Sequence, residues 1–246
     1  MHTTRWAKIA ADLRQGIQDG TYPPGSKLPS IPDLMNKYGV ARDTVRDAIS
    51  RLANEGLVTP LRGIGTVVRD MTPVELAYSP EAPAQPWSQQ TKNGRDDVVL
   101  AELVDADPGI IQRLRLPKGS QVLHRVRHQS VGGQVAQIHD QWIPADLYSS
   151  IANATKFDLI ADRNKEQPNL YEQMREAGYQ PATATETLTC RMPDPDETTT
   201  LELPPGVPVL VTHRITTDRD GTPLETSTFV GAGDRMSQTF RVPLES

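Results

Sequence analysis

The chain has 246 residues, of which 37% are hydrophobic, and its 26 Lys and Arg against 31 Asp and Glu give a formal net charge of −5. This length is enough for two domains of ordinary size, each with its own core. No window approaches the roughly 20 apolar residues of a membrane helix, and the first residues do not read as a secretion signal. Cys190 is the single cysteine, so it cannot form an internal disulfide or a cysteine metal cluster. We expect a cytoplasmic protein with no membrane segment, metal or cofactor.

The charge is unevenly distributed along the chain. Residues 1–70 hold ten Lys and Arg against seven Asp and Glu, a net charge of +3, whereas residues 71–246 hold 16 against 24, a net charge of −8. Such a difference between the two ends is typical of a nucleic-acid-binding part joined to another domain. Because +3 is a modest charge, we expect this part to need a dimer partner to hold DNA tightly.

Two helices are predicted in the first 40 residues. Ser30 can cap the second one, with Pro32 tolerated in its first turn, and Gly39 ends it. The length of that helix fits a helix-turn-helix. The first helix is amphipathic and ends near Gly20, because apolar residues recur at spacings of three and four. These residues are Trp6, Ile9, Ala10, Leu13 and Ile17.

A third helix and a β-hairpin follow. The helix runs from about Arg42 to Glu55, with Val45, Ala48, Ile49 and Leu52 as its buried stripe, and stops at Gly56. Two short strands, 57–60 and 66–69, then flank a glycine-containing tip. This order indicates a DNA-reading helix followed by a wing, although a solvated basic helix beside a plain hairpin is the alternative. The candidate DNA-contacting residues are Arg42, Asp43, Thr44, Arg46, Arg62, Gly63, Ile64 and Gly65.

The N-terminal part carries four motifs, PGSKLPS at 24–30, YGVARDTVRDAI at 38–49, EGLV at 55–58 and GIGTVV at 63–68. These motifs resemble the GntR family of bacterial transcription regulators. The resemblance covers nearly all of the first 70 residues and implies a winged helix-turn-helix. It also implies that Arg42, Thr44 and Arg46 contact operator DNA in the major groove, while the tip at 63–65 enters the minor groove.

The N-terminal part departs from the family pattern in two places. Ile31 and Pro32 stand where relatives usually have Glu and Arg, so we expect one phosphate contact fewer. Ala41 stands where the third helix commonly begins with Ser, so its N-cap must come from elsewhere or go unfilled. Asp43 would partly compensate through the helix dipole, although it would repel nearby phosphate.

Between Thr72 and Asp97 the composition changes to that of a linker. Pro73, Pro80, Pro83 and Pro86 are interspersed with Ala, Ser and Gln, which form a poor core. Trp87 is an exception, and we expect its ring to dock on one of the domains. The expected domains are therefore 1–70, a linker at 71–97, and 98–246.

The C-terminal part contains an internal repeat. Asp107-Pro108, Leu116-Pro117 and Gly119 recur 87 positions later, together with four further identities. In each copy a short helix leads through Leu-Pro-x-Gly into a strand, a polar turn and a returning strand, at 135–143 or 224–230. Duplicated halves of a sheet commonly leave a ligand-binding cleft at their junction. Chance recurrence in an α+β domain is the alternative.

Residues 98–246 contain a set of anchor motifs, which are Arg125-Val126-Arg127, Ile143-Pro144, Leu170-Tyr171, residues 203–210, Arg214, residues 221–225 and 233–235. With these anchors the segment resembles the effector domain of the HutC branch of this family, the UTRA domain. The resemblance implies a chorismate-lyase-like α+β fold and a small-molecule site. The overall expectation is an α+β chain with an N-terminal winged helix-turn-helix domain. The implied effector-binding residues are Arg125, Arg127, Asn169, Tyr171 and Glu225. His139, where the sequence departs from the family pattern, is included as a sixth candidate.

Arg125 and Arg127 are alternate residues of one predicted strand and so share a face, where they can bind phosphate or carboxylate. A structural ion pair with Asp or Glu is the alternative. His139 stands where sugar-phosphate binders tend to have Glu, and Phe229 to Ala232 replace a common aromatic-Arg pair. The predicted effector is therefore an anionic small molecule, not necessarily a sugar phosphate.

The sequence favours a regulator over an enzyme. It contains no P-loop, GxGxxG, GxSxG or HExxH motif, and its five histidines lack close metal-ligand spacing. We expect a homodimeric repressor that binds palindromic operator DNA, because one winged helix reads about half a site. A constitutive repressor with a vestigial pocket, such as those guarding mobile elements, is the alternative.

Overall fold

The computed structural model describes residues 4–69, 74–78, 87, 91 and 93–240. The chain divides into two compact units, Met1–Pro73 with Met192–Pro208, and Val74–Arg191 with Val209–Ser246. No helix in the described ranges is long and apolar enough to span a membrane.

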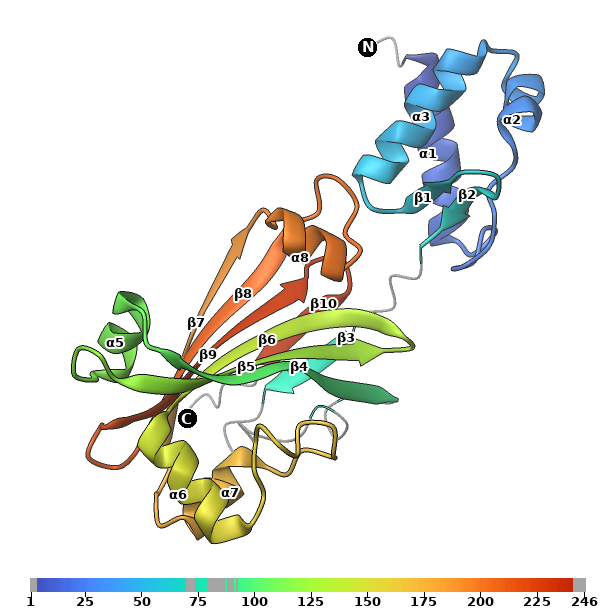
Figure 1. Cartoon of the computed structure of the whole chain (residues 1–246). Helices are drawn as coiled ribbons and strands as arrows, with labels where there is room; N and C mark the ends of the chain where they lie inside the picture. Colours follow the sequence, from blue (N-terminus) through green and yellow to red (C-terminus); the bar gives the residue numbers. More distant parts are fainter. Residues whose placement is uncertain (1–3, 70–73, 79–86, 88–90, 92, 241–246) are drawn as a thin grey trace, which may run out of the picture. The chain divides into compact units, whose positions relative to one another are not determined.

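The first unit contains a three-helix head with a β-hairpin (Figure 1). Its elements are α1 (Arg5–Gln18), α2 (Ile31–Tyr38), α3 (Arg42–Asn54), β1 (Val58–Leu61) and β2 (Gly65–Val68). The predicted stripe of α3 is buried and packs with Ile9 and Leu13 of α1 and Leu34 of α2. Trp6, by contrast, is 37% exposed at the start of α1 and lies outside this core.

The helix ends follow the predicted signals. The Ser30 side chain accepts a hydrogen bond from the Asp33 backbone N–H, and the Asp33 carboxylate accepts one from the Ser30 backbone N–H, which completes a capping box. Gly39 ends α2 with a left-handed φ of 61°, which costs glycine little. Ala41, however, provides no side-chain cap, so the N-cap of α3 goes unfilled.

A six-stranded antiparallel sheet forms the second unit, in the order β4-β5-β6-β9-β8-β7. Its strands are β4 (Gly94–Asp105), β5 (Gln121–Val131), β6 (Gln134–Pro144), β7 (Thr183–Arg191), β8 (Val209–Thr217) and β9 (Pro223–Ala232). A separate parallel pair joins β3 (Val74–Tyr78) to β10 (Met236–Phe240).

The sequence repeat is visible in the local structure and in the strand order. Asp107 caps α5 (Pro108–Leu114) and Asp194 caps α8 (Pro195–Thr200), each followed by proline in the first turn. Gly119 and Gly206 then share a φ of 84° in the turns that follow the two helices. In the sheet, β4-β5-β6 and β7-β8-β9 are mirrored halves that meet where β6 pairs with β9.

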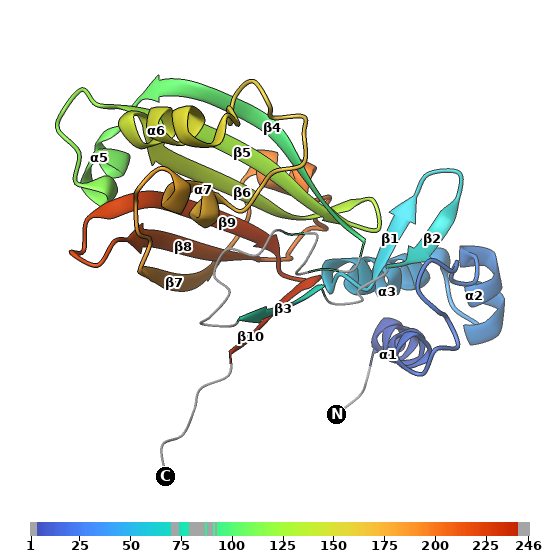
Figure 2. The same cartoon turned by 90° about the horizontal axis from the view of Figure 1, so that it is seen from below.

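Two helices, α6 (Ala145–Thr155) and α7 (Leu170–Glu176), lie side by side on one face of the sheet (Figures 1 and 2). Their apolar residues pack on Leu123, Ile143 and Leu224 of β5, β6 and β9. Val122 points to the opposite face, because successive side chains of a strand alternate, and packs with Ile110 and Leu114 of α5. The face of the sheet on which α6 and α7 lie carries four of the six predicted effector residues, Arg125, Arg127, His139 and Glu225.

The expectation that Trp87 docks on a domain is confirmed. Its side chain is 2% exposed, packs with Ala136 and Met236, and donates from Nε1 to the Ser130 carbonyl at 3.0 Å. Gly94 permits this packing, because a Cβ there would lie 2.8 Å from the Trp87 ring. The range expected to be a linker thus also includes β3 and the start of β4, and the proposed domain boundaries stay a prediction.

Candidate functional site

The exposed side of α3 carries free positive charge at its N-terminal half. Arg42 and Arg46 are exposed and lie on one face, four residues apart. Within the described residues, neither of the two side chains forms a hydrogen bond or an ion pair. Asp43 is exposed as well, and Thr44 is half-buried between them. The two arginines are therefore available to an external anion.

The C-terminal half of α3 differs, because its charge is internally paired. Glu55 binds Arg14 of α1 at 2.7 Å and Arg51 at 2.8 Å. Arg51 is four residues from Glu55, the spacing at which helical side chains meet. This pairing ties α1 to the end of α3.

The hairpin tip has the backbone that the two glycines predict. Gly63 has a φ of 77° and Gly65 a φ of 117°, both in a region that disfavours other residues. Ile64 between them is 53% exposed, and Arg62 beside them is exposed. The tip thus presents an apolar side chain and a cation on a narrow turn.

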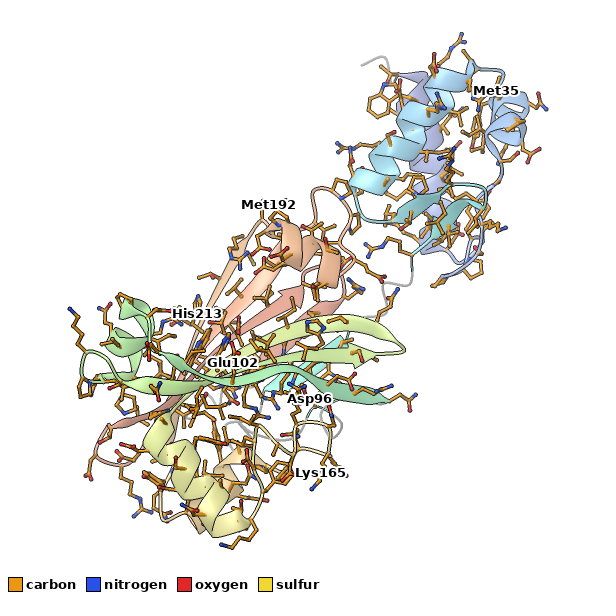
Figure 3. All side chains as sticks on the ribbon, in the orientation of Figure 1. Met35, Asp96, Glu102, Lys165, Met192 and His213 are labelled. Carbon is orange, nitrogen blue, oxygen red and sulfur yellow. The ribbon has the colours of Figure 1, made fainter. Side chains whose placement is uncertain are left out.

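On the sheet, the two candidate arginines share a face as predicted but have different partners. Arg127 forms an ion pair with Asp96 at 3.0 Å and donates a second hydrogen bond to His139 Nδ1. Asp96 lies on the edge strand β4 (Figure 3). Arg214 forms the equivalent pair in the other half of the sheet, with Glu186 of β7 at 2.5 Å. The structural ion pair considered from the sequence therefore exists at Arg127.

Arg125 has no carboxylate partner among the described residues. It is 2% exposed and donates to two amides, at 3.4 Å to Gln141 Oε1 and at 2.8 Å to Gln167 Oε1. Its Nε is buried without a partner. Burial, and then the charge of Arg127, lower the pKa of Arg125 to about 9, so it stays charged at neutral pH. The structure thus holds a buried cation without a direct counter-charge, an arrangement that is costly unless something compensates it.

His139 links the two halves of the sheet as a neutral imidazole. Burial lowers its pKa well below 6.5, and the charges of Arg127, Arg214 and Arg125 add to this effect. Because Nδ1 accepts from Arg127, Nε2 carries the proton and donates to Ser227 Oγ at 3.0 Å. The ring also stacks on Phe229, with centroids 4.0 Å apart. His139 therefore places a neutral hydrogen-bonding group beside the arginines.

Glu225 is the centre of the polar cluster and is 1% exposed. Its carboxylate accepts from Thr216 at 2.6 Å, from Ser227 at 2.7 Å and from Gln141 at 3.4 Å. The Thr216 hydroxyl uses its hydrogen to donate to Glu225. It therefore accepts a hydrogen bond from the Tyr171 hydroxyl, at 2.7 Å. Burial, and then the charge of Glu225, raise the pKa of Tyr171 to about 12.

The structure joins five of the six predicted effector residues in one hydrogen-bonded network, called here the Arg125–Glu225 network. These five are Arg125, Arg127, His139, Tyr171 and Glu225. Asn169 lies outside it, because its side chain caps α7 by accepting from the Tyr171 and Glu172 backbone N–H groups.

Five members of the network or its edge were missed in the sequence, namely Gln141, Thr216, Ser227, Asp96 and Gln167. Gln141 carried a usable signal, because it follows His139 by two residues and so shares its strand face. Ser227 likewise follows Glu225 by two residues. Asp96 and Gln167 carried no signal, since they reach the arginines from 31 and 42 residues away.

Together, these features define a chain with a winged helix-turn-helix head, a type of domain that binds DNA, and a second domain whose duplicated sheet carries a buried polar cluster. The family model described as bacterial regulatory proteins, gntR family, matches residues 6–68, and the model of the UTRA domain matches residues 89–237. The chain therefore belongs to the GntR family of bacterial transcription regulators, with a UTRA domain after its DNA-binding head. GntR regulators bind DNA, and UTRA domains bind small-molecule effectors.

Individual relatives agree with this assignment. The HTH-type transcriptional regulator GgaR of Escherichia coli strain K12 is 28% identical, over 92% of this chain and 86% of its own length. A fructoselysine utilization operon transcriptional repressor of the same strain is 26% identical, over 66% and 68%. The crystal structure of a GntR-family transcriptional regulator superposes with a TM-score of 0.60 at 27% identity, covering 99% of both chains. These proteins are regulators rather than enzymes, and so is this chain.

Proposed function

We propose that the chain is a repressor that binds operator DNA through α3 and the wing. The supporting observation is the free charge of Arg42 and Arg46 at the start of α3, in contrast to the paired Arg51 at its end. The unfilled N-cap at Ala41 leaves backbone N–H groups that a DNA phosphate can cap. Thr44 and Asp43 lie on the same first turn, and Arg62 and Ile64 approach the minor groove with the glycines of the tip. The relative named as an operon repressor supports repression.

We infer that the chain acts as a homodimer on a palindromic operator. One winged helix reads about half a site, and two heads double the modest charge available to neutralise phosphates. A bacterial operator lies in the cytoplasm, which is where the protein would act. The test is sequencing of genomic fragments that the purified protein selects, with and without a metabolite extract of the cells. A palindromic motif is expected, and absence of any enriched motif would refute the proposal.

We also propose that the effector is a small anion that binds at Arg125. The observation that carries this proposal is a guanidinium 2% exposed whose partners are two neutral amides and whose Nε has none. An effector carboxylate or phosphate would supply the missing charge through charge-assisted hydrogen bonds. Arg127, His139, Tyr171 and Glu225 would contribute through the same network, and Asn169 by positioning α7.

Thermal-shift screening of anionic metabolites tests the effector proposal. Arg125→Met removes the charge while retaining bulk, and should abolish the shift that a binding anion causes. Arg115→Met is the matched control, because Arg115 is exposed and donates to the Gly221 carbonyl. Equal shifts in wild type and Arg125→Met would remove the anion role. A DNA motif that no extract affects would favour the constitutive repressor instead.

A further inference from the structure

A side-chain hydrogen bond joins the loop between α6 and α7, residues 157–168, to the sheet. Gln167 Oε1 accepts from Arg125 Nη2 at 2.8 Å. Its Nε2 meanwhile donates to three carbonyls of the same loop, those of Asp162, Arg163 and Lys165, at 3.2, 3.3 and 2.9 Å. One side chain thus both closes the turn of the loop and binds the buried cation.

The rest of the loop is held by its own contacts and by apolar packing. Asp158 Oδ1 accepts from the Ile160 and Ala161 backbone N–H groups and from the Tyr148 hydroxyl. Leu159 is 1% exposed in the core beneath α6 and α7. Lys165 of the same loop, labelled in Figure 3, is exposed. Gln167 is therefore a polar attachment on a loop that has other supports.

The chemistry of this attachment differs from that of the neighbouring arginines. Arg127 and Arg214 are held by carboxylates, Asp96 and Glu186, and separating such a buried pair leaves an uncompensated charge. Gln167 is neutral, so it satisfies donors of Arg125 without neutralising the charge. An anion gains more from the same guanidinium than an amide does.

We propose that the Gln167 side chain occupies the position of the effector at Arg125. An anionic effector must then displace Gln167 from Arg125 in order to bind. The proposal rests on the anion site proposed above. Displacement would free the end of the loop two residues before Asn169, the N-cap of α7. Tyr171 of α7 forms a hydrogen bond with Thr216 of the sheet. Displacement of Gln167 by an anion at Arg125 would therefore connect ligand binding to the position of α7. Gln167 is thus a positioning and specificity residue of the effector site.

A ligand-free measurement tests the contact itself. Hydrogen exchange of the full-length protein is followed in peptides that cover residues 157–168, for wild type, Arg125→Met and Arg127→Met. Loss of the anchor in Arg125→Met should speed exchange in this loop about tenfold. Arg127→Met is the control, because Arg127 binds Asp96 and His139 rather than the loop. Equal exchange in wild type and Arg125→Met would overturn the proposal.

Competition is tested by calorimetric titration with inorganic phosphate. Gln167→Ala removes the competitor, and Gln167→Met keeps its bulk without donor or acceptor, so both should bind phosphate about tenfold more tightly than wild type. Gln137→Met, a buried glutamine that bonds to Gln129, should leave the affinity unchanged. Unchanged or weaker binding in both Gln167 variants would overturn the proposal. Phosphate binding that Arg125→Met does not reduce would instead refute the anion site, while the exchange experiment still decides the loop contact.

Discussion

The neutral His139 predicts an acid sensitivity that one substitution should remove. In the folded protein its pKa is depressed well below 6.5 by burial and by three arginines. In the unfolded chain the imidazole titrates near its ordinary value of 6.5. Below that pH the unfolded state binds a proton that the folded state does not. Stability is therefore fully present above about pH 6.5 and falls as the pH decreases.

The magnitude follows from the linkage. At pH 5.5, one unit below the unfolded value, this single group should cost about 1 kcal/mol of unfolding free energy relative to neutral pH. Gln at position 139 can still accept from Arg127 and donate to Ser227, but it does not titrate. The His139→Gln variant should therefore lose about 1 kcal/mol less than wild type between pH 7.5 and pH 5.5.

Urea unfolding of both proteins at the two pH values measures this difference. Burial also lowers the pKa of His128 and of His213, so wild type and variant share a background loss in acid. The difference between the two proteins isolates His139. Identical losses in wild type and His139→Gln would show that this imidazole is not held neutral, and the direction of the His139 hydrogen bonds would then be wrong.

Three further predictions concern the DNA head and the Trp87 anchor. Arg46→Ala should weaken binding to the selected operator by about 1–3 kcal/mol in a fluorescence anisotropy titration, whereas Arg51→Ala, whose partner is Glu55, should change it little. Gly65→Ala, at a φ of 117°, should destabilise the wing by about 1 kcal/mol and weaken operator binding without changing salt dependence. Trp87→Ala should cost about 3–5 kcal/mol of stability by urea unfolding, and a smaller loss than 1 kcal/mol would contradict its burial.

The head was predictable because its signals are local. Ser30, Gly39 and Gly56 end or begin helices through the chain immediately beside them, and their geometry agrees with the sequence. The wing strands are each displaced by one residue, to 58–61 and 65–68, within the usual uncertainty of strand ends. Trp6 joined the predicted apolar stripe by spacing alone, and spacing does not show which end of a helix extends beyond its core.

The geometry of the candidate effector site was predictable in part. Strand alternation placed Arg125 and Arg127 on one face, but it could not distinguish them, because the difference arises from strands and loops far along the chain. Asp96 neutralises Arg127 from the edge strand, while Gln167 reaches Arg125 from a loop. The repeat predicted two similar halves of the sheet. The hydrogen bond between His139 of β6 and Ser227 of β9 joins the network across the line where these halves meet.

The most direct test of the account measures operator affinity for wild type and Arg125→Met, with and without the metabolite fraction that shifts wild-type melting. Arg125 lies in the sheet domain, so both proteins should bind the operator equally in the absence of metabolites. The fraction should change the affinity of wild type and leave that of Arg125→Met unchanged. An equal response of both proteins would contradict control of DNA binding through an anion at Arg125.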